Sequence, residues 1–233
     1  TGTEFVIEKA GTGATLEKAK TGNFDMVIVH ARALEDQFIK DGYGQNRRDV
    51  MYNDFVILGP KSDPAGIKGM KSAAEAFKVL AEKKAPFISR GDMSGTHVAE
   101  MNIWKAAGIT PDGDKDEWYT VFSLGKLGNG PTTIFADKRA AYTLMDRATY
   151  LKQQKNVKIV PLVEGDKAML NLIAAIEVSP KKFSNVNNAE TVKFIDWLCS
   201  DEAQLIIKDF EVKKFGQPLF FPNSDQWNKN HPK

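Results

Sequence analysis

Long apolar runs are missing from this chain of 233 residues. No stretch approaches the roughly 18–20 consecutive apolar residues that a membrane-spanning helix needs. The sequence starts at Thr1 without a signal peptide, so we expect its beginning to be processed or trimmed. These features predict a protein that does not span a membrane.

Cysteine and histidine are both scarce. Cys199 is the only cysteine, which rules out a disulfide within the chain, and its apolar helical surroundings are typical of a small buried residue. The three histidines, His30, His97 and His231, are too dispersed to form a metal site. We therefore expect neither a metal site nor a cofactor.

An excess of charge of one sign is also lacking. The 32 basic and 30 acidic residues leave a net charge of +2 and are well mixed along the chain. No basic cluster stands apart from carboxylates, which argues against a nucleic-acid partner. The pairs Arg47–Arg48, Lys213–Lys214 and Glu35–Asp36 are typical of solvated surface.

Short apolar runs alternate with helical patterns, which predicts the α/β class. Residues 5–7 form the first expected strand. The continuous run 25–29 is typical of a strand buried on both faces of a parallel sheet. A capping box at Ser72 and Glu75 begins a helix that runs to about Lys84. Further helices are expected at 33–40, 95–108, 132–138, 146–153, 189–199 and 201–210, and further strands at 86–88, 141–144 and 157–161.

Two long apolar strands, 53–59 and 171–178, enclose about a hundred residues with their own alternating pattern. We expect the enclosed residues 60–171 to form an inserted lobe, and residues 1–59 with 172–233 to form the other. The polar stretch 61–69 is predicted to connect the lobes. A ligand would then bind in the cleft between the lobes, where helix N-termini and the ends of strands converge.

The turn at 90–96 is the clearest candidate site. It follows an apolar strand and begins a helix, and Arg90, Ser94 and Thr96 add a guanidinium and two hydroxyls to the free backbone N–H groups. Gly95 lets a ligand approach the backbone closely. Such a set of donors is suited to an anion. The alternative is that Ser94 only caps the helix while Arg90 pairs with Asp92 on the surface.

Asp92 bears on which anion would bind. If its carboxylate points into the site, it repels a fully ionised dianion but accepts a proton from an anion that carries one. If it instead holds Arg90 in place, the site suits an anion without a proton near neutral pH. The sequence leaves both orientations open.

Two other turns contain comparable groups. Gly11–Gly13 offers N–H groups and the Thr12 hydroxyl at a helix start, although such turns also serve as tight connections. The loop 125–130 looks like a phosphate loop but lacks the Gly-Lys-Ser/Thr ending, which argues against nucleotide binding. His97 could act as a base in an enzyme for a phosphorylated or carboxylated substrate, but the donors around it describe binding better.

Several segments together resemble the tungstate-binding proteins of bacterial ABC uptake transporters, and the resemblance covers nearly the whole chain. The turn Arg-x-Asp-x-Ser-Gly-Thr alone is also similar to phosphate-binding proteins. The segments that carry the resemblance are Ser89–His97, Arg47–Pro60, Asp63–Ile67 and Ala141–Arg147.

The resemblance implies a periplasmic binding protein fold of type II: two lobes with mixed sheets flanked by helices. It implies a non-enzymatic receptor, periplasmic or lipid-anchored at the cell surface, that captures tungstate and delivers it to a membrane permease. Molybdate or phosphate receptors are the alternatives within this fold. Arg90, Ser94 and Thr96 would contact the anion from one lobe, and Thr12 and Gly13 from the other. Family members usually begin with a strand that ends in a ligand loop, and this sequence starts after that point; we expect lobe 1 to lack this strand here, either because it is trimmed or because it is missing.

Overall fold

The computed structural model describes residues 2–232 and divides into two compact units. Unit 1 contains residues 1–52 and 171–233, and unit 2 contains residues 53–170. The chain leaves unit 1 within strand β2 (Gly44–Gly59) and returns at the start of β7 (Leu170–Val178). The first boundary differs from the expected 59/60 because residues 55–59 pair with strands of unit 2.

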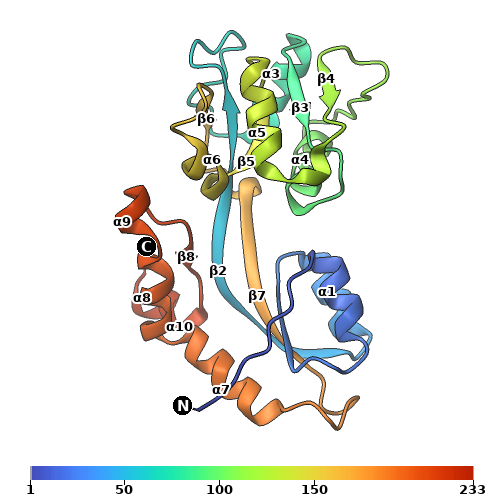
Figure 1. Ribbon diagram of the computed structural model, residues 1–233, viewed down its shortest axis with the longest axis vertical. Coiled ribbons are helices and arrows are strands. Elements are labelled where there is room, and N and C mark those ends of the chain that lie inside the picture. Colours follow the sequence, from blue (N-terminus) through green and yellow to red (C-terminus); the bar gives the residue numbers. More distant parts are fainter. Residues whose placement is uncertain (1, 233) are drawn as a thin grey trace. The chain divides into compact units, whose positions relative to one another are not determined.

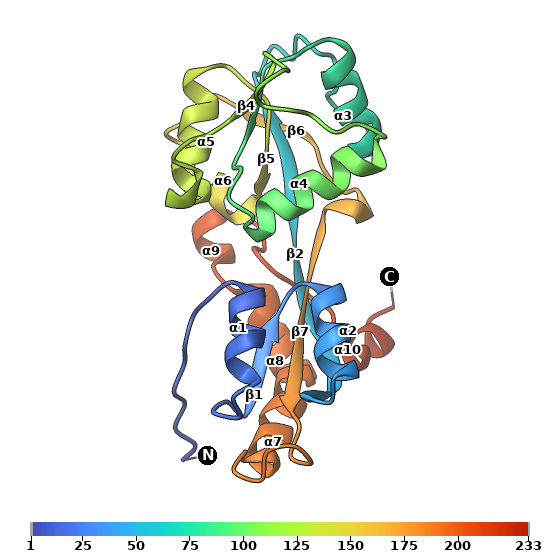
Figure 2. The same ribbon diagram turned by 90° about the vertical axis from the view of Figure 1, so that its right-hand side faces the viewer.

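Unit 1 is built around antiparallel strands (Figures 1 and 2). Strand β1 (Met26–Val29) pairs with β7, and β8 (Phe221–Pro222) pairs with the first half of β2. The helices of this unit are α1 (Thr12–Ala19), α2 (Arg32–Lys40), α7 (Asn188–Cys199), α8 (Asp201–Asp209), α9 (Val212–Phe215) and α10 (Asp225–Asn230).

Helices cover both faces of β7. Ile176 packs with Leu16 of α1 and Phe38 of α2, whereas its neighbour Ala175 packs with Ile195 of α7. Successive side chains of a strand point to opposite faces, so these neighbours belong to two separate apolar clusters. The unit is therefore a three-layer arrangement, with α1 and α2 on one face of β7 and α7 on the other. Figure 1 shows α1 and α8 on opposite sides of β7.

Two expectations for unit 1 are wrong. Residues 5–7 form no strand, and the side chains of Val6 and Ile7 are 91% and 75% exposed, because this segment joins no backbone ladder. The run 25–29 is a strand, but it is antiparallel to β7 and Ile28 is exposed. An apolar run indicates burial without indicating the direction of the neighbouring strand.

Unit 2 has a mainly antiparallel set of strands and a short parallel pair. The second half of β2 pairs with β5 (Thr143–Asp146) and β6 (Val160–Val163), and β3 (Phe87–Ser89) runs parallel to β4 (Tyr119–Val121). Its helices are α3 (Ala73–Glu82), α4 (Gly95–Ala106), α5 (Asn129–Lys138) and α6 (Arg147–Gln153), with short 3-10 helices at Gly125–Leu127 and Lys167–Met169.

The core of unit 2 lies on both faces of β2. Ile57 belongs to a cluster with Phe77 of α3, Phe87 of β3 and Trp104 of α4. The next residue, Leu58, belongs to the opposite cluster, which contains Ala136 of α5. This double burial explains why the second half of β2 reads as a continuous apolar run.

Three details of unit 2 differ from expectation. The stretch 61–69 does not connect the units, because Ala65 and Ile67 are buried in the unit 2 core. Strands β5 and β6 begin two to three residues later than expected, and α5 begins three residues earlier. Helix α3 begins as expected, and the Ser72 hydroxyl accepts a hydrogen bond from the backbone N–H of Glu75 at 3.3 Å.

Candidate functional site

The turn between β3 and α4 reverses the chain through two residues with left-handed backbone angles. Gly91 has φ 64° and Met93 has φ 58°, a conformation that a methionine rarely adopts. Helix α4 then begins at Gly95 with Ser94 as its N-cap, and the Ser94 hydroxyl accepts from the His97 N–H at 3.4 Å. The N–H groups of the first turn of a helix have no partner within the helix, so this turn presents them at its positive end.

Arg90 is held between two side chains. Its Nη1 donates to Oδ1 of Asn129 and its Nη2 donates to Oδ2 of Asp92. The side chain is only 11% exposed, and within residues 2–232 its buried Nε has no hydrogen-bond partner. The guanidinium is therefore fixed in its plane by two of its five N–H groups.

The Asp92 carboxylate points toward Arg90 and the backbone of its own turn. Its Oδ2 accepts from Arg90, and its Oδ1 accepts from the Ser94 backbone N–H at 3.1 Å. Burial acts to raise the pKa of Asp92, but hydrogen bonds from Ser94 and the charge of Arg90 outweigh it, so the pKa lies below its usual value. Of the two orientations that the sequence left open, the structure has the one in which Asp92 holds Arg90.

A second helix start meets this turn. Helix α5 begins at Asn129, whose Oδ1 also accepts from the Thr96 hydroxyl at 3.1 Å. The preceding loop lies against the turn so closely that a Cβ at Gly125 would stand 1.9 Å from the Arg90 carbonyl oxygen. The sequence singled out this glycine-rich loop but compared it only with nucleotide loops. Asn129 was missed, although its place at a glycine-flanked helix start was a usable signal.

Of the two hydroxyls predicted to bind an anion, that of Ser94 caps α4 and that of Thr96 donates to Asn129. Thr96 is buried. The capping role of Ser94 and the Arg90–Asp92 pair match the alternative interpretation of the turn, except that the pair is buried and not on the surface.

His97 completes the turn from the helix side. Its Nδ1 accepts from the Met93 backbone N–H at 2.9 Å. Burial lowers the pKa of His97, and the charge of Arg90 lowers it further, while Asp92 opposes both. The imidazole is therefore a neutral acceptor that stabilises the left-handed Met93.

Glu100 lies one turn further along α4, and it is 2% exposed. Its Oε1 accepts from the Tyr119 hydroxyl at 2.7 Å and from Trp104 Nε1 at 3.2 Å. Burial raises the pKa of Glu100 to about 7, although hydrogen bonds from Tyr119, Trp104 and the Arg90 backbone act against burial. An ionisable carboxyl group thus lies behind the turn.

The residues predicted in unit 1 lie at the start of α1. Gly11 is the N-cap and contributes no side-chain bond, and Gly13 is the second residue of the helix. The Thr12 hydroxyl accepts from the His30 backbone N–H at 3.3 Å, which ties the helix start to the end of β1. The structure thus brings Arg90, Ser94, Gly95 and Thr96 together in unit 2, while Thr12 and Gly13 belong to unit 1.

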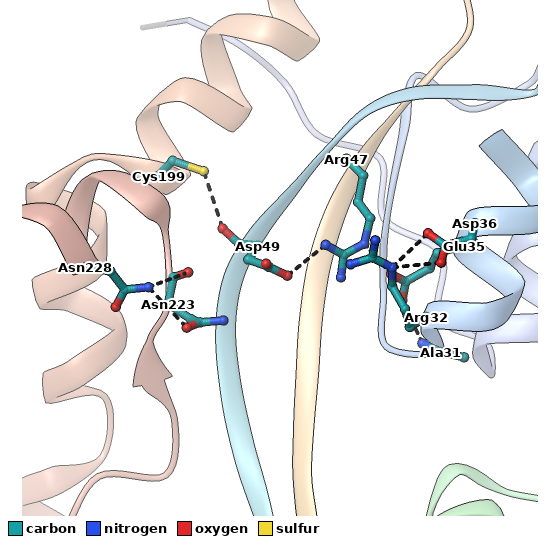
Figure 3. Close-up of polar contacts among 9 residues, drawn as sticks. All are labelled: Ala31, Arg32, Glu35, Asp36, Arg47, Asp49, Cys199, Asn223 and Asn228. Atoms are coloured by element: carbon teal, nitrogen blue, oxygen red, sulfur yellow. Dashed lines mark hydrogen bonds and ion pairs between the residues drawn. The ribbon is translucent and has the colours of Figure 1, made fainter. Parts of the chain in front are cut away.

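Two pairs expected on the surface are partly buried (Figure 3). Glu35 is fully buried; its Oε1 accepts from the Ala31 N–H at 2.7 Å and its Oε2 from Arg47 Nε at 2.7 Å. Arg47 also donates to Asp49 at 2.9 Å. Their neighbour Asp36 is exposed, as expected, and pairs with Arg32. The buried pair of Glu35 and Arg47 therefore fixes the start of α2. This start directly follows His30, whose backbone N–H donates to the Thr12 hydroxyl.

Two negative findings concern the whole described chain. Across residues 2–232, no helix is long and apolar enough to cross a membrane. Within the same range, no group of three or more histidine, cysteine, aspartate or glutamate side chains is arranged to hold a metal ion.

Comparison with known proteins places these features in context. A family model described as the PBP superfamily domain matches residues 1–202. A Haloferax volcanii protein assigned as the anion-binding protein of an ABC transporter is 47% identical over 92% of this chain, which spans 62% of that relative's length. The tungstate-binding protein TupA of Peptoclostridium acidaminophilum is 40% identical over 96% of this chain and 77% of the relative.

A solved structure agrees with these matches. The tungstate-binding protein TupA from Desulfovibrio alaskensis G20 superposes with a TM-score of 0.85 at 39% identity, over 94% of this chain and 86% of that one. The fold class expected from the sequence, mixed sheets flanked by helices in a periplasmic binding protein, is therefore confirmed.

Proposed function

We propose that this chain, which belongs to the tungstate-binding proteins of the PBP superfamily, is a receptor that captures tungstate and delivers it to the permease of an ABC transporter. The receptor would act outside the cytoplasm, either in the periplasm or anchored at the cell surface. It would need no chemical step, because binding and release are sufficient for transport. Tungstate is favoured over other oxyanions because the similar proteins from Peptoclostridium acidaminophilum and Desulfovibrio alaskensis are tungstate-binding proteins.

One observation carries the choice of anion class: both oxygens of Asp92 are already engaged by Arg90 and Ser94. Phosphate keeps at least one proton near neutral pH, and a buried site must offer that proton an acceptor or lose binding energy. Tungstate and molybdate carry no proton there and need only donors. A turn with a guanidinium held in place by Asp92, together with helix N–H groups, supports an unprotonated dianion, because the Asp92 carboxylate is directed at Arg90 and the Ser94 N–H.

Tungstate and molybdate share the same charge and nearly the same size, so these donors alone discriminate little between them. An enzyme acting on a phosphorylated substrate is the weaker candidate. It would use His97 as a base, but the Nδ1 of His97 already accepts the Met93 N–H. Thr12 and Gly13 remain proposed ligand residues.

Titration calorimetry of the full-length protein with tungstate, molybdate, sulfate and phosphate tests the proposal. We expect the two metal oxyanions to bind more tightly than phosphate. Replacing Arg90 by alanine should weaken tungstate binding at least tenfold, about 1.4 kcal/mol. Arg139→Ala is the matched control, because Arg139 is exposed and follows the far end of α5, about 15 Å along the helix from Asn129.

The possible results separate the alternatives. If none of the four anions binds, the receptor function is wrong. If phosphate binds most tightly, the protein is a phosphate receptor and the argument from Asp92 fails. If Arg90→Ala changes affinity no more than Arg139→Ala, Arg90 is not part of the site.

A further inference from the structure

The side chain of Asn129 joins three groups of unit 2. Its Oδ1 accepts from Arg90 Nη1 and from the Thr96 hydroxyl, while its Nδ2 donates to Oδ2 of Asp146 at 2.5 Å. An amide has one accepting and one donating end, so its orientation determines which neighbours it can serve. A carboxylate can only accept, and contact with Asp146 therefore turns the Asn129 oxygen toward Arg90 and Thr96.

Asp146 is itself held in place. It is the N-cap of α6, where Oδ1 accepts from the Thr149 N–H at 2.8 Å and Oδ2 accepts from the Thr149 hydroxyl at 2.6 Å. The start of one helix thus orients an amide at the start of another. Nothing in this chain of contacts depends on an exposed, freely rotating side chain.

Arg90 gains a second fixed point from this arrangement. A guanidinium bound only to Asp92 could rotate about that contact, whereas one bound to Asp92 and Asn129 is fixed in its plane. Donors that are oriented before the ligand arrives need no reorganisation on binding. The other N–H groups of Arg90 are then held in fixed directions, and its buried Nε has no hydrogen-bond partner among the described residues.

We propose that Asn129, oriented by Asp146, is a positioning residue for the oxyanion site, and that its neutrality is part of its role. It fixes Arg90 and Thr96 through an oxygen that carries no net charge. A carboxylate of the same shape could accept the same two hydrogen bonds, but it would add a negative charge beside Asp92 and oppose a dianion. This inference rests on the proposed anion-binding function.

The sharpest test is Asn129→Asp, which keeps the shape and the accepting oxygen, adds a negative charge and replaces the donor to Asp146 with a second oxygen. We expect tungstate affinity at pH 8 to fall at least a hundredfold. The loss should shrink as the pH is lowered toward 6.5, because the introduced carboxyl group would contact that of Asp146, and two carboxyl groups in contact raise each other's pKa and share a proton. Asn156→Asp, at an exposed position beyond α6, is the control for added charge and should change affinity less than threefold.

A second pair of variants tests whether Asn129 acts through Arg90. Asn129→Ala should weaken tungstate binding about tenfold in the natural protein and less than twofold in the Arg90→Ala background, because a positioning residue matters only while its target is present. Circular dichroism of each variant shows whether it folds. If Asn129→Asp does not fold, the comparison of the alanine variants decides alone.

Three results would overturn the inference. They are an unchanged affinity in Asn129→Asp, a loss that does not depend on pH, and equal effects of Asn129→Ala with and without Arg90. Each of these presumes that the unaltered protein binds tungstate. If the unaltered protein binds no oxyanion, the proposed function itself has failed, and that outcome is distinct.

Discussion

Replacing Glu100 by glutamine should stabilise the protein at pH 8 and should not do so at pH 5. The pKa of Glu100 is raised from 4.5 to about 7 by burial, so the folded protein keeps a proton that the unfolded chain has already released. Between about pH 4.5 and pH 7, Glu100 therefore takes up a proton when the protein folds. The contribution of Glu100 to stability therefore decreases as the pH rises from about 4.5 to 7, and the full cost is present above pH 7.

The magnitude follows from the shift. The rise of the Glu100 pKa from 4.5 to about 7 corresponds to roughly 3 kcal/mol of unfolding free energy, since each tenfold change in proton affinity is worth about 1.4 kcal/mol. Glutamine removes this cost and keeps an oxygen that can accept from Tyr119 and Trp104. We expect Glu100→Gln to gain up to about 3 kcal/mol over the natural protein at pH 8. At pH 5, where Glu100 is protonated in the folded state, the gain should vanish.

Urea unfolding at pH 5, 6, 7 and 8 measures this difference, with tryptophan fluorescence as the signal because Trp104 contacts Glu100. The other titrating groups are common to both proteins and cancel in the difference. Glu117→Gln removes a charge from an exposed position in the same unit and should stay within about 0.5 kcal/mol of the natural protein. A Glu100→Gln difference that is constant from pH 5 to pH 8 would refute the reasoning.

Two further variants test the framework around the site. Gly125→Ala would place a methyl group 1.9 Å from the Arg90 carbonyl oxygen, so the turn must move; calorimetry should show at least a tenfold loss of tungstate affinity. Asp54→Ala removes the partner of Arg147, whose Nε donates to it at 2.8 Å in a mostly buried pair, and should lower the free energy of unfolding by about 3 kcal/mol. The exposed pair of Arg32 and Asp36 provides the control, since Asp36→Ala should lower the free energy of unfolding by less than about 1 kcal/mol. Equal costs for the two aspartate variants would show that burial does not set the strength of the Asp54 pair.

The sequence predicted best what short-range signals determine. The helix after Ser72 and the break at Ser200 between α7 and α8 follow from capping residues, and both lie where they were expected. The turn at 90–96 was found in the same way, because an apolar strand, a donor-rich turn and a helical pattern follow one another directly. Its residues lie together without any help from distant parts of the chain.

The features that could not be predicted depend on contacts between residues that lie far apart in the sequence. The run 25–29 was predicted to be a parallel strand, but its partner β7 lies about 150 residues later and runs antiparallel. Asn129 lies 39 residues beyond Arg90, and no local pattern states that they meet. Glu35 and Arg47 each look like surface charge until the fold buries them together. In each case the missing information was a long-range contact.

Asn129 and Glu100 follow one electrostatic rule at the turn that contains Arg90. Each contacts the turn from a different element, and each provides acceptor oxygens where an ionised carboxylate would oppose an incoming dianion. The amide side chain of Asn129 carries no charge, whereas Glu100 is partly protonated near neutral pH because burial raises its pKa to about 7. The remaining carboxylate in direct contact, Asp92, is ionised and matched by Arg90. Because the charge of Arg90 is already balanced, the proposed anion would be held mainly by oriented donors and helix N–H groups, and we expect binding to depend on geometry more than on salt concentration.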